Sequence, residues 1–289
     1  MNRPVLAVHG GAGGLTDELR EHEGEYRAAI ERALDAGARA LKEGGGAVEA
    51  VCAAVIEMES FPLFNAGHGS ALCADGSVEM SASVMRGSDR AAGAVALMTR
   101  TRHPVAAAAA LLGDAEVLLA GQSAEVQAAA NGLEQLEPEA FITERQQRRL
   151  AERLKDGGQT VGAVCLDEAG LLAAATSTGG LQGQRPGRIG DSPLIGAGTW
   201  ADGHVAVSCT GKGEAFIRAG AARLVGALVE HGHALDSAAR AALAAVAECD
   251  GDGGLIAVDA SGKVTMPMST GAMPRGVWRI GQKPAAMVP

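Results

Sequence analysis

In residues 157–180, GGQTVGAVCLDEAGLLAAATSTGG, a polar stretch stops at Gln159 and an alternating apolar run begins at Thr160. Alternation of this kind is typical of a strand. A second apolar run follows, so we predict strands over residues 160–166 and 171–176. Strand formation does not by itself require a threonine at this edge, between a loop and a buried strand.

The segments on either side of this region combine strands with helices. Apolar residues three and four positions apart indicate the helices, and glycine turns bound the strands. The predicted strands cover residues 4–9, 91–100, 204–211 and a hairpin at 254–267, and the predicted helices cover residues 25–44, 46–60, 103–113, 215–232 and 235–249. Sheets with helices packed outside fit this order better than a simple alternating βαβ arrangement.

Residues 132–159 differ in composition from the rest of the chain. They are rich in Glu, Gln and Arg and include a glycine pair just before Gln159. We predict an exposed connector here. It is the one candidate boundary in a chain whose 289 residues fit either one large domain or two small ones.

The bulk composition argues against several classes of protein. The net charge is −9 and no basic block occurs, which speaks against nucleic-acid binding. Five cysteines are scattered singly, which indicates reduced thiols, and the histidines show no metal-ligand pattern with them. No secretory signal or membrane-spanning stretch is recognised, so we predict a soluble, cytoplasmic protein.

A glycine-rich turn, GGAGG at residues 10–14, follows the first predicted strand. It lacks the spacing and context of a dinucleotide-binding fingerprint, so we interpret it as a tight turn with close packing. We interpret His9, beside it, as a hydrogen-bonded structural residue and not as a catalyst.

Polar residues among glycines gather in three loops of the second half, TSTGG, PGRIGDSP and SCTGKGE. Glycine allows backbone N–H groups to approach a ligand closely, and loops at strand ends often carry binding sites. Arg188 and Asp191 have the charges that an amino-acid headgroup requires, one for its α-carboxylate and one for its α-ammonium group. A local surface ion pair between the two residues is the alternative.

Thr160 has a chemical interpretation as well as a structural one. A threonine hydroxyl needs a base, and a threonine at a chain N-terminus can use its own α-amine, whose pKa lies near about 8. This chemistry requires a cut before Thr160, a flexible connector upstream and a rigid strand downstream, which the sequence provides. An ordinary strand-forming threonine is the alternative.

Motifs along nearly the whole chain add to this interpretation. They are VHGGAGG and FPLFNAGHGS in the first half, then TVGAVCLD, TSTGG, PGRIGDSPLIGAG, SCTGKGE, GGLIAVD and MSTGAM. In content and order they resemble plant-type L-asparaginases, also called isoaspartyl peptidases, which are N-terminal nucleophile hydrolases.

The resemblance implies an α+β fold, a four-layer αββα sandwich of two mostly antiparallel sheets with helices outside. Residues 1–289 would form one domain, cut between Gln159 and Thr160. The products would be an α subunit of residues 1–159, ending in the connector 132–159, and a β subunit of residues 160–289. A homodimer of αβ units is implied as well.

The resemblance also assigns roles, residue by residue. Thr160 would be the nucleophile, with Thr178 supporting its hydroxyl. Arg188 would bind the substrate α-carboxylate and Asp191 its α-amine, which would also contact the Gly213 carbonyl. Thr210 and the Gly211 N–H would form the oxyanion hole. Asn65 would brace the region of the nucleophile. No cofactor is implied except a structural sodium ion, held by backbone carbonyls of Met58, Glu59, Phe61, Phe64, Ala66 and His68.

The implied reaction releases L-aspartate from L-asparagine and from β-aspartyl dipeptides through a threonyl acyl-enzyme. One alternative is a glycosylasparaginase-like hydrolase, although TSTGG and the lack of a recognised signal count against it. Another is a non-catalytic protein that binds acidic amino acids, which would not need Thr160. The sequence departs from the family pattern at Gln159, Lys212 and Ala272, where glycine, a small or polar residue and an acidic residue are more usual.

Overall fold

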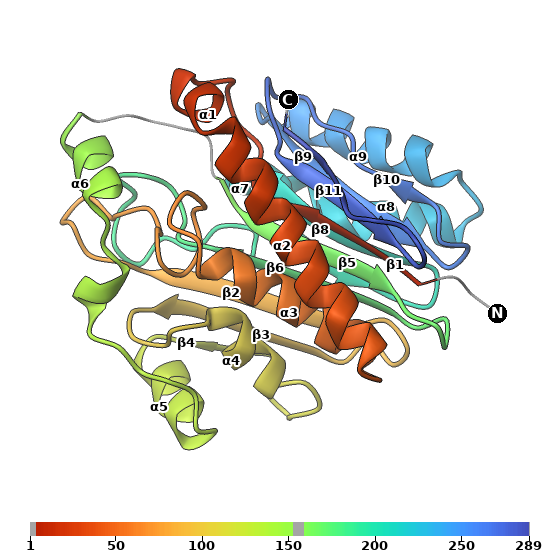
Figure 1. The fold of residues 1–289 in the computed structure, drawn as a ribbon, viewed down its shortest axis with the longest axis horizontal. Coiled ribbons are helices and arrows are strands. Elements are labelled where there is room, and N and C mark those ends of the chain that lie inside the picture. Colours follow the sequence, from red (N-terminus) through yellow and green to blue (C-terminus); the bar gives the residue numbers. More distant parts are fainter. Residues whose placement is uncertain (1–3, 153–158, 289) are drawn as a thin grey trace.

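The computed structural model describes residues 4–152 and 159–288. Within them the larger sheet has eight strands in the order β12-β11-β1-β5-β6-β2-β3-β4 (Figure 1). These strands are β1 (Val5–His9), β2 (Met80–Arg86), β3 (Ala92–Met98), β4 (Leu118–Ala120), β5 (Val161–Leu166), β6 (Leu172–Thr178), β11 (Arg275–Arg279) and β12 (Ala285–Met287). The strands predicted on both sides of residue 167 are therefore neighbours in the centre of this sheet.

A second sheet has four strands in the order β10-β9-β8-β7. They are β7 (Thr199–Ala201), β8 (Val205–Gly211), β9 (Gly253–Asp259) and β10 (Val264–Thr265). The β9–β10 pair confirms the predicted hairpin at residues 254–267. Adjacent named strands are antiparallel in both sheets, except for the parallel pair β3–β4.

Helices pack against each sheet. The large sheet contacts α2 (Glu23–Lys42), α3 (Ala47–Glu59) and α4 (Pro104–Ala110), and the small sheet contacts α8 (Ala221–Glu230) and α9 (Leu235–Glu248). Helix α3 is buried along most of one side, and Pro104 lies in the first turn of α4, where its missing N–H is tolerated. Among the described residues no helix has both the length and the apolar character to cross a membrane.

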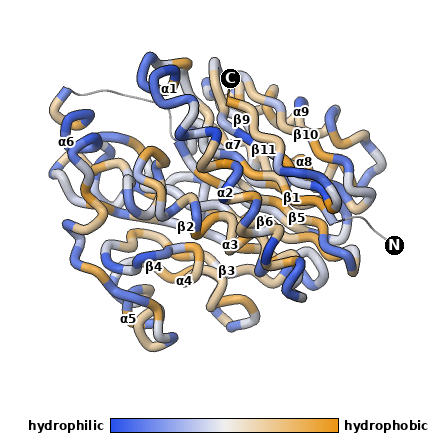
Figure 2. Tube along the Cα trace, in the orientation of Figure 1, coloured by the Kyte–Doolittle hydropathy of each residue, from blue (hydrophilic) through white to orange (hydrophobic). Residues whose placement is uncertain are grey.

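The alternation of side chains along the strands divides the core. In β1, Leu6 and Val8 join the cluster formed with α2, α3 and α4, whereas Val5 and Ala7 join a cluster shared with the second sheet. Strand β9 behaves likewise, with alternate residues facing the first sheet or the cluster formed with α8 and α9. Figure 2 shows this apolar interior along the central strands.

The helix predicted over residues 215–232 is wrong in one respect, because it is two helices. Helix α7 (Gly213–Ala219) ends at Gly220, whose φ of 57° lies in the left-handed region, and α8 begins at Ala221. The first N–H groups of α8 bond to a loop, since Ala222 N–H donates to the Ala197 carbonyl and Arg223 N–H to the Gly196 carbonyl. Tertiary bonding therefore sets this break.

The segment predicted as an exposed connector, residues 132–159, is partly helical and partly buried. It contains the short 3-10 helix η1 (Pro138–Phe141) and α6 (Glu144–Ala151). Phe141, Gln146 and Arg149 are buried, so the expectation of exposure is wrong at these positions. Residues 153–158 lie outside the described part of the chain.

Candidate functional site

Thr160 lies at the start of β5, buried beside the end of β6. The antiparallel register pairs Val161 with Ser177, so the next residues outward, Thr160 and Thr178, face each other. The Thr160 hydroxyl donates to the Thr178 hydroxyl oxygen at 3.2 Å, and it lies 3.4 Å from the Ser192 hydroxyl. Three hydroxyl groups from separate segments therefore meet at the predicted nucleophile.

The second sheet reaches the same point through Thr210, near the end of β8. The Thr210 hydroxyl accepts hydrogen bonds from the Thr160 N–H at 3.2 Å and from the Ala12 N–H at 3.0 Å. Gly211 follows with a φ of 148°, and a Cβ there would lie 2.3 Å from the Asp252 carbonyl oxygen. The loop after Thr210 thus requires glycine.

The glycine turn after β1 packs against the residue that precedes Thr160. At Gly11, where φ is 105°, a Cβ would lie 2.8 Å from the Cα of Gln159 and 3.1 Å from its carbonyl carbon. The interpretation of GGAGG as a turn with close packing is confirmed, and its close neighbour is Gln159. Ala272 fixes the turn from the other side through paired backbone hydrogen bonds with Gly13.

His9 belongs to a buried polar network beneath β5. Its Nε2 lies 3.0 Å from the Ser208 hydroxyl, which in turn lies 2.7 Å from the Thr176 hydroxyl. Burial lowers the pKa of His9 to about 3, against a smaller opposing effect of a backbone hydrogen bond with Thr160. The imidazole is therefore neutral at physiological pH, and the interpretation of His9 as a hydrogen-bonded structural residue is confirmed.

Asp191 and Arg188 approach the same point, the α-carbon of Gly213. A Cβ at Gly213 would lie 2.8 Å from Arg188 Nη2 and 2.9 Å from Asp191 Oδ1. Asp191 is 3% exposed, and its Oδ2 has no hydrogen-bond partner among the described residues. Burial raises the pKa of Asp191 to about 7, although the Arg188 charge opposes the rise.

Arg188 forms its ion pair with Glu214 and not with Asp191, so the alternative of a local Arg188–Asp191 pair is wrong. Its Nε and Nη2 donate to the two Glu214 carboxylate oxygens, each at 2.9 Å. Its Nη1 donates to Gln184 Oε1 at 3.3 Å. The hydrogen bonds from Arg188 lower the pKa of Glu214.

Asn65 connects the loop before β2 to the turn after β6. Its Nδ2 donates to the Gly180 carbonyl at 2.7 Å, and its Oδ1 accepts from the Ala71 N–H at 2.6 Å. Its own carbonyl accepts from the Gly179 N–H. The turn that follows Thr178 is thereby fixed on both sides.

The loop predicted to hold sodium is tightly wound. A Cβ at Gly67 would lie 2.4 Å from the Glu59 carbonyl oxygen, and a Cβ at Gly69 would lie 2.8 Å from that of Phe64. The Glu59 carbonyl accepts from the His68 N–H at 2.8 Å. Among the described residues no group of three or more His, Cys, Asp or Glu side chains could hold a metal ion.

Lys212 is exposed and directed to a neighbouring loop, where its Nζ donates to the Asp250 carbonyl at 2.7 Å. Sequence reasoning missed three other residues of the site: Ser192, Glu214 and Gln184. Ser192 and Glu214 stand inside the quoted motifs GDSP and TGKGE, so proximity in sequence to Asp191 and Gly213 could have indicated them.

Comparison with known proteins shows the family of the chain. The sequence profile described as asparaginase matches residues 2–159 and 146–288. The chain belongs to the asparaginase family. It is 41% identical to the isoaspartyl peptidase of Salmonella typhimurium, with 98% of each chain covered. It is 39% identical to the isoaspartyl peptidase of Escherichia coli, with 98% of this chain and 95% of the relative covered. The isoaspartyl peptidase/L-asparaginase of Bos taurus is 40% identical, with 94% and 92% covered.

Proposed function

We propose that this member of the asparaginase family is an amidohydrolase that cuts itself between Gln159 and Thr160. It then releases L-aspartate from L-asparagine and from β-aspartyl dipeptides. One observation carries the proposal: the hydroxyl and the nitrogen of Thr160 are held by threonines from two different sheets, Thr178 at 3.2 Å and Thr210 at 3.2 Å. The names of the relatives point to the same two substrate classes.

Self-cleavage follows from the position of Gln159. The Thr160 hydroxyl oxygen attacks the Gln159 carbonyl carbon, the C–N bond breaks, and the Thr160 nitrogen takes up the proton. Water then hydrolyses the resulting ester, which leaves a carboxylate on Gln159 and restores the Thr160 hydroxyl. The packing of Gly11 against the Gln159 backbone supports this step, because it restricts the position of the scissile bond.

Turnover uses the amine that the cut creates. The Thr160 α-amine, with a pKa of about 8 as a free terminus, takes the hydroxyl proton as the oxygen attacks the substrate side-chain carbonyl. Thr210 and the Gly211 N–H stabilise the oxyanion, and each such donor contributes on the order of 3 kcal/mol. Ammonia or an amino compound leaves, and water releases aspartate from the ester.

The headgroup residues determine which acids bind. The unfilled Oδ2 of buried Asp191 accepts the substrate α-ammonium, together with the Gly213 carbonyl, and Arg188 binds the α-carboxylate. Glu214 and Gln184 position the Arg188 guanidinium for that contact. Asparagine and β-aspartyl dipeptides share this headgroup, which explains activity on both.

The two rival functions receive less support. A glycosylasparaginase-like hydrolase is disfavoured by the names of the relatives, which are isoaspartyl peptidases and asparaginases. A non-catalytic binder of acidic amino acids would need Asp191 and Arg188, but it would have no use for the hydroxyl cluster at Thr160.

We also infer the finer architecture and setting. The three core clusters, one between helices and the large sheet, one between the sheets and one between the small sheet and helices, support a single four-layer αββα domain. The α subunit is residues 1–159 and the β subunit is residues 160–289. A cytoplasmic homodimer of αβ units is part of the same proposal.

A structural sodium ion in the loop from Met58 to His68 is likewise proposed. The carbonyls of Glu59 and Phe64, which lie close to the glycines that wind the loop, support it. Oxygen ligands suit a hard cation of this kind. The melting temperature in sodium chloride is expected to exceed that in choline chloride at equal ionic strength. Equal melting temperatures would contradict the sodium site.

The mass of the denatured protein tests the main proposal. The wild-type chain is expected to divide after Gln159 into fragments of 159 and 130 residues (289 − 159 = 130), while Thr160→Ala stays intact. The divided protein is expected to release aspartate from asparagine and β-aspartyl dipeptides. A wild-type chain that stays whole while folded would overturn the proposal and favour the binding protein.

A further inference from the structure

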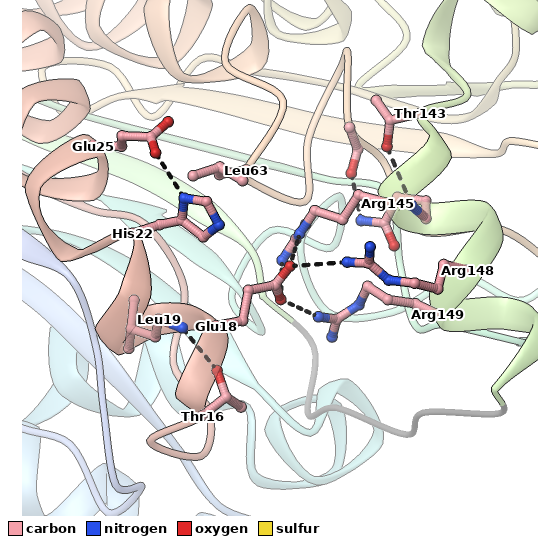
Figure 3. Close-up of polar contacts among 12 residues, drawn as sticks. Thr16, Glu18, Leu19, His22, Glu25, Leu63, Thr143, Arg145, Arg148 and Arg149 are labelled. Carbon is pink, nitrogen blue, oxygen red and sulfur yellow. Dashed lines mark hydrogen bonds and ion pairs between the residues drawn. The ribbon is translucent and has the colours of Figure 1, made fainter.

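A single carboxylate on α1 (Asp17–Glu21) faces three arginines of α6 (Figure 3). Glu18 accepts from Arg145 Nε at 2.7 Å and Nη2 at 3.0 Å, and from Arg149 Nη1 at 2.7 Å, while Arg148 lies 4.0 Å away. The side chains of Arg145 and Arg149 are only 11% and 8% exposed. Most other ion pairs of the described chain, such as Arg100–Glu137, lie in solvent.

Burial makes this contact energetically different from a surface ion pair. Desolvation alone would raise the pKa of Glu18, but the hydrogen bonds and charges of Arg145, with Arg149 and Arg148, bring it below its ordinary value. An exposed pair contributes little to stability, whereas a buried charge that loses its partner is strongly destabilising. Glu18 therefore holds α6 firmly against α1, although Figure 2 shows both helices as hydrophilic.

Helix α6 also forms hydrogen bonds with loops that border the site around Thr160. Gln146 Nε2 donates to the Gly69 carbonyl at 2.7 Å, and Gln182 Nε2 donates to the Gln146 carbonyl at 3.0 Å. Gln146 and Arg149 line a small cavity together with Gln159, Asn65 and Gly180. The face of α6 that contacts Glu18 therefore borders the residue at the proposed cut.

The segment before α1 also contacts Gln159. Gly11 packs on the Gln159 backbone, and Glu18 follows seven residues later (18 − 11 = 7). Arg149 precedes Gln159 by ten residues (159 − 149 = 10). Gln159 thus contacts Gly11 and shares a cavity with α6, and Glu18 connects α6 to the helix that follows Gly11.

We propose that Glu18, Arg145 and Arg149 form a clamp that positions the Gln159 carbonyl for attack by the Thr160 hydroxyl, so that the clamp sets the rate of self-cleavage. The inference rests on the proposed function, because it concerns the same cut. Glu18 acts through α6 and the glycine turn and touches none of the reacting atoms, so it is a positioning residue.

The test follows the decay of the intact chain by denatured mass spectrometry at 25 °C. Glu18→Gln keeps the shape of the side chain and removes its charge, and we expect it to slow cleavage about tenfold or more. Arg145→Gln breaks the same contact from α6 and is expected to slow it likewise. Glu21→Gln, at an exposed position on the same helix, is the matched control and is expected to cleave at the wild-type rate.

A variant could cleave slowly because its fold is less stable, and this effect must be separated from a displaced Gln159 carbonyl. Val225→Ala removes buried methyl groups on α8, remote from the clamp, and melting of each variant is measured with Thr160→Ala to keep the chain whole. Slow cleavage in Glu18→Gln and Arg145→Gln, but not in Val225→Ala of similar melting temperature, supports the clamp. Cleavage of Glu18→Gln at the wild-type rate, or slowing in proportion to melting temperature in all variants, overturns it. If the wild type itself stays whole, the proposed function fails, and the clamp fails with it.

Discussion

Two carboxylates near the site, Asp191 and Glu18, are held in opposite ways. Asp191 is buried with an acceptor oxygen that has no partner among the described residues, and burial raises its pKa to about 7. Glu18 is also partly buried, but three guanidinium groups surround it and keep its pKa below the ordinary value.

The difference indicates which of the two carboxylates is suited to bind a substrate group. A buried charge without a full set of partners destabilises a fold, and such groups are characteristic of binding and catalytic sites. A carboxylate whose two oxygens already accept three hydrogen bonds from arginines has little capacity left for a substrate. Asp191 therefore suits an incoming ammonium group, and Glu18 suits a structural contact.

The largest expected effect is the loss of substrate recognition when Asp191 is neutralised. Asp191→Asn is expected to lower kcat/KM for asparagine at least about 100-fold, because removing one partner of a buried charge pair weakens binding by about 2–5 kcal/mol. Steady-state kinetics on fully cleaved protein measure it. Asp114→Asn, in an exposed loop, is the control. A fall of less than tenfold would mean that Asp191 does not bind the α-ammonium.

Replacing the carboxylate by the matching amide is expected to change the free energy of unfolding in opposite directions at Asp191 and at Glu18. The raised pKa of Asp191 means that its burial destabilises the folded state increasingly as pH rises from 3.8 through about 7. Asp191→Asn should therefore stabilise the Thr160→Ala chain at pH 8, by up to about 4 kcal/mol. The lowered pKa of Glu18 means that its ionised form contributes stability above pH 4.5. Because Glu18 is only half-buried and solvent screens its charge, Glu18→Gln should destabilise by about 1 kcal/mol.

Urea denaturation at pH 8, in the uncut Thr160→Ala background, measures both changes. Their opposite signs are the informative result, since a general effect of removing negative charge from a chain of net charge −9 would stabilise both variants. Destabilisation by both substitutions would show that Asp191 has partners that stabilise its ionised form in the free protein.

The contrast between these two sites also shows what a sequence conveys. Periodicity predicted Thr160 at the edge of a buried strand, and the structure places it just before β5. Arg188 and Asp191 lie three residues apart in one loop. The partners of these residues depend on tertiary structure. Glu214 is 26 residues from Arg188, and Glu18 is 127 residues from Arg145. The break at Gly220 likewise depends on a remote loop. No local pattern encodes such pairings.

A smaller effect is expected when the space between Arg188 and Asp191 is filled. Gly213→Ala would place a Cβ 2.8 Å from Arg188 Nη2 and 2.9 Å from Asp191 Oδ1. The position is helical, so alanine adds no backbone strain, but Arg188 and Asp191 must move to admit the Cβ. We expect KM for asparagine to rise about tenfold, the effect of about 1.4 kcal/mol. Gly203→Ala, where a Cβ meets nothing within 4 Å, is the control. An unchanged KM would place the headgroup elsewhere.

The smallest expected effect is the pH dependence of binding, and it compares the two carboxylates directly. An α-ammonium group binds the ionised form of Asp191, whose pKa is about 7 in the free protein. KM for asparagine should therefore fall about fivefold as pH rises from 6 to 7, and level off above pH 7. Glu18 is ionised throughout this range because its pKa is lowered, so it adds no slope to KM.

The Thr160 amine, as a free chain terminus, has a pKa of about 8, so its titration should affect kcat. Asp191→Asn should remove the KM slope and keep the kcat slope, whereas a slope in KM that survives the substitution would assign it to another group.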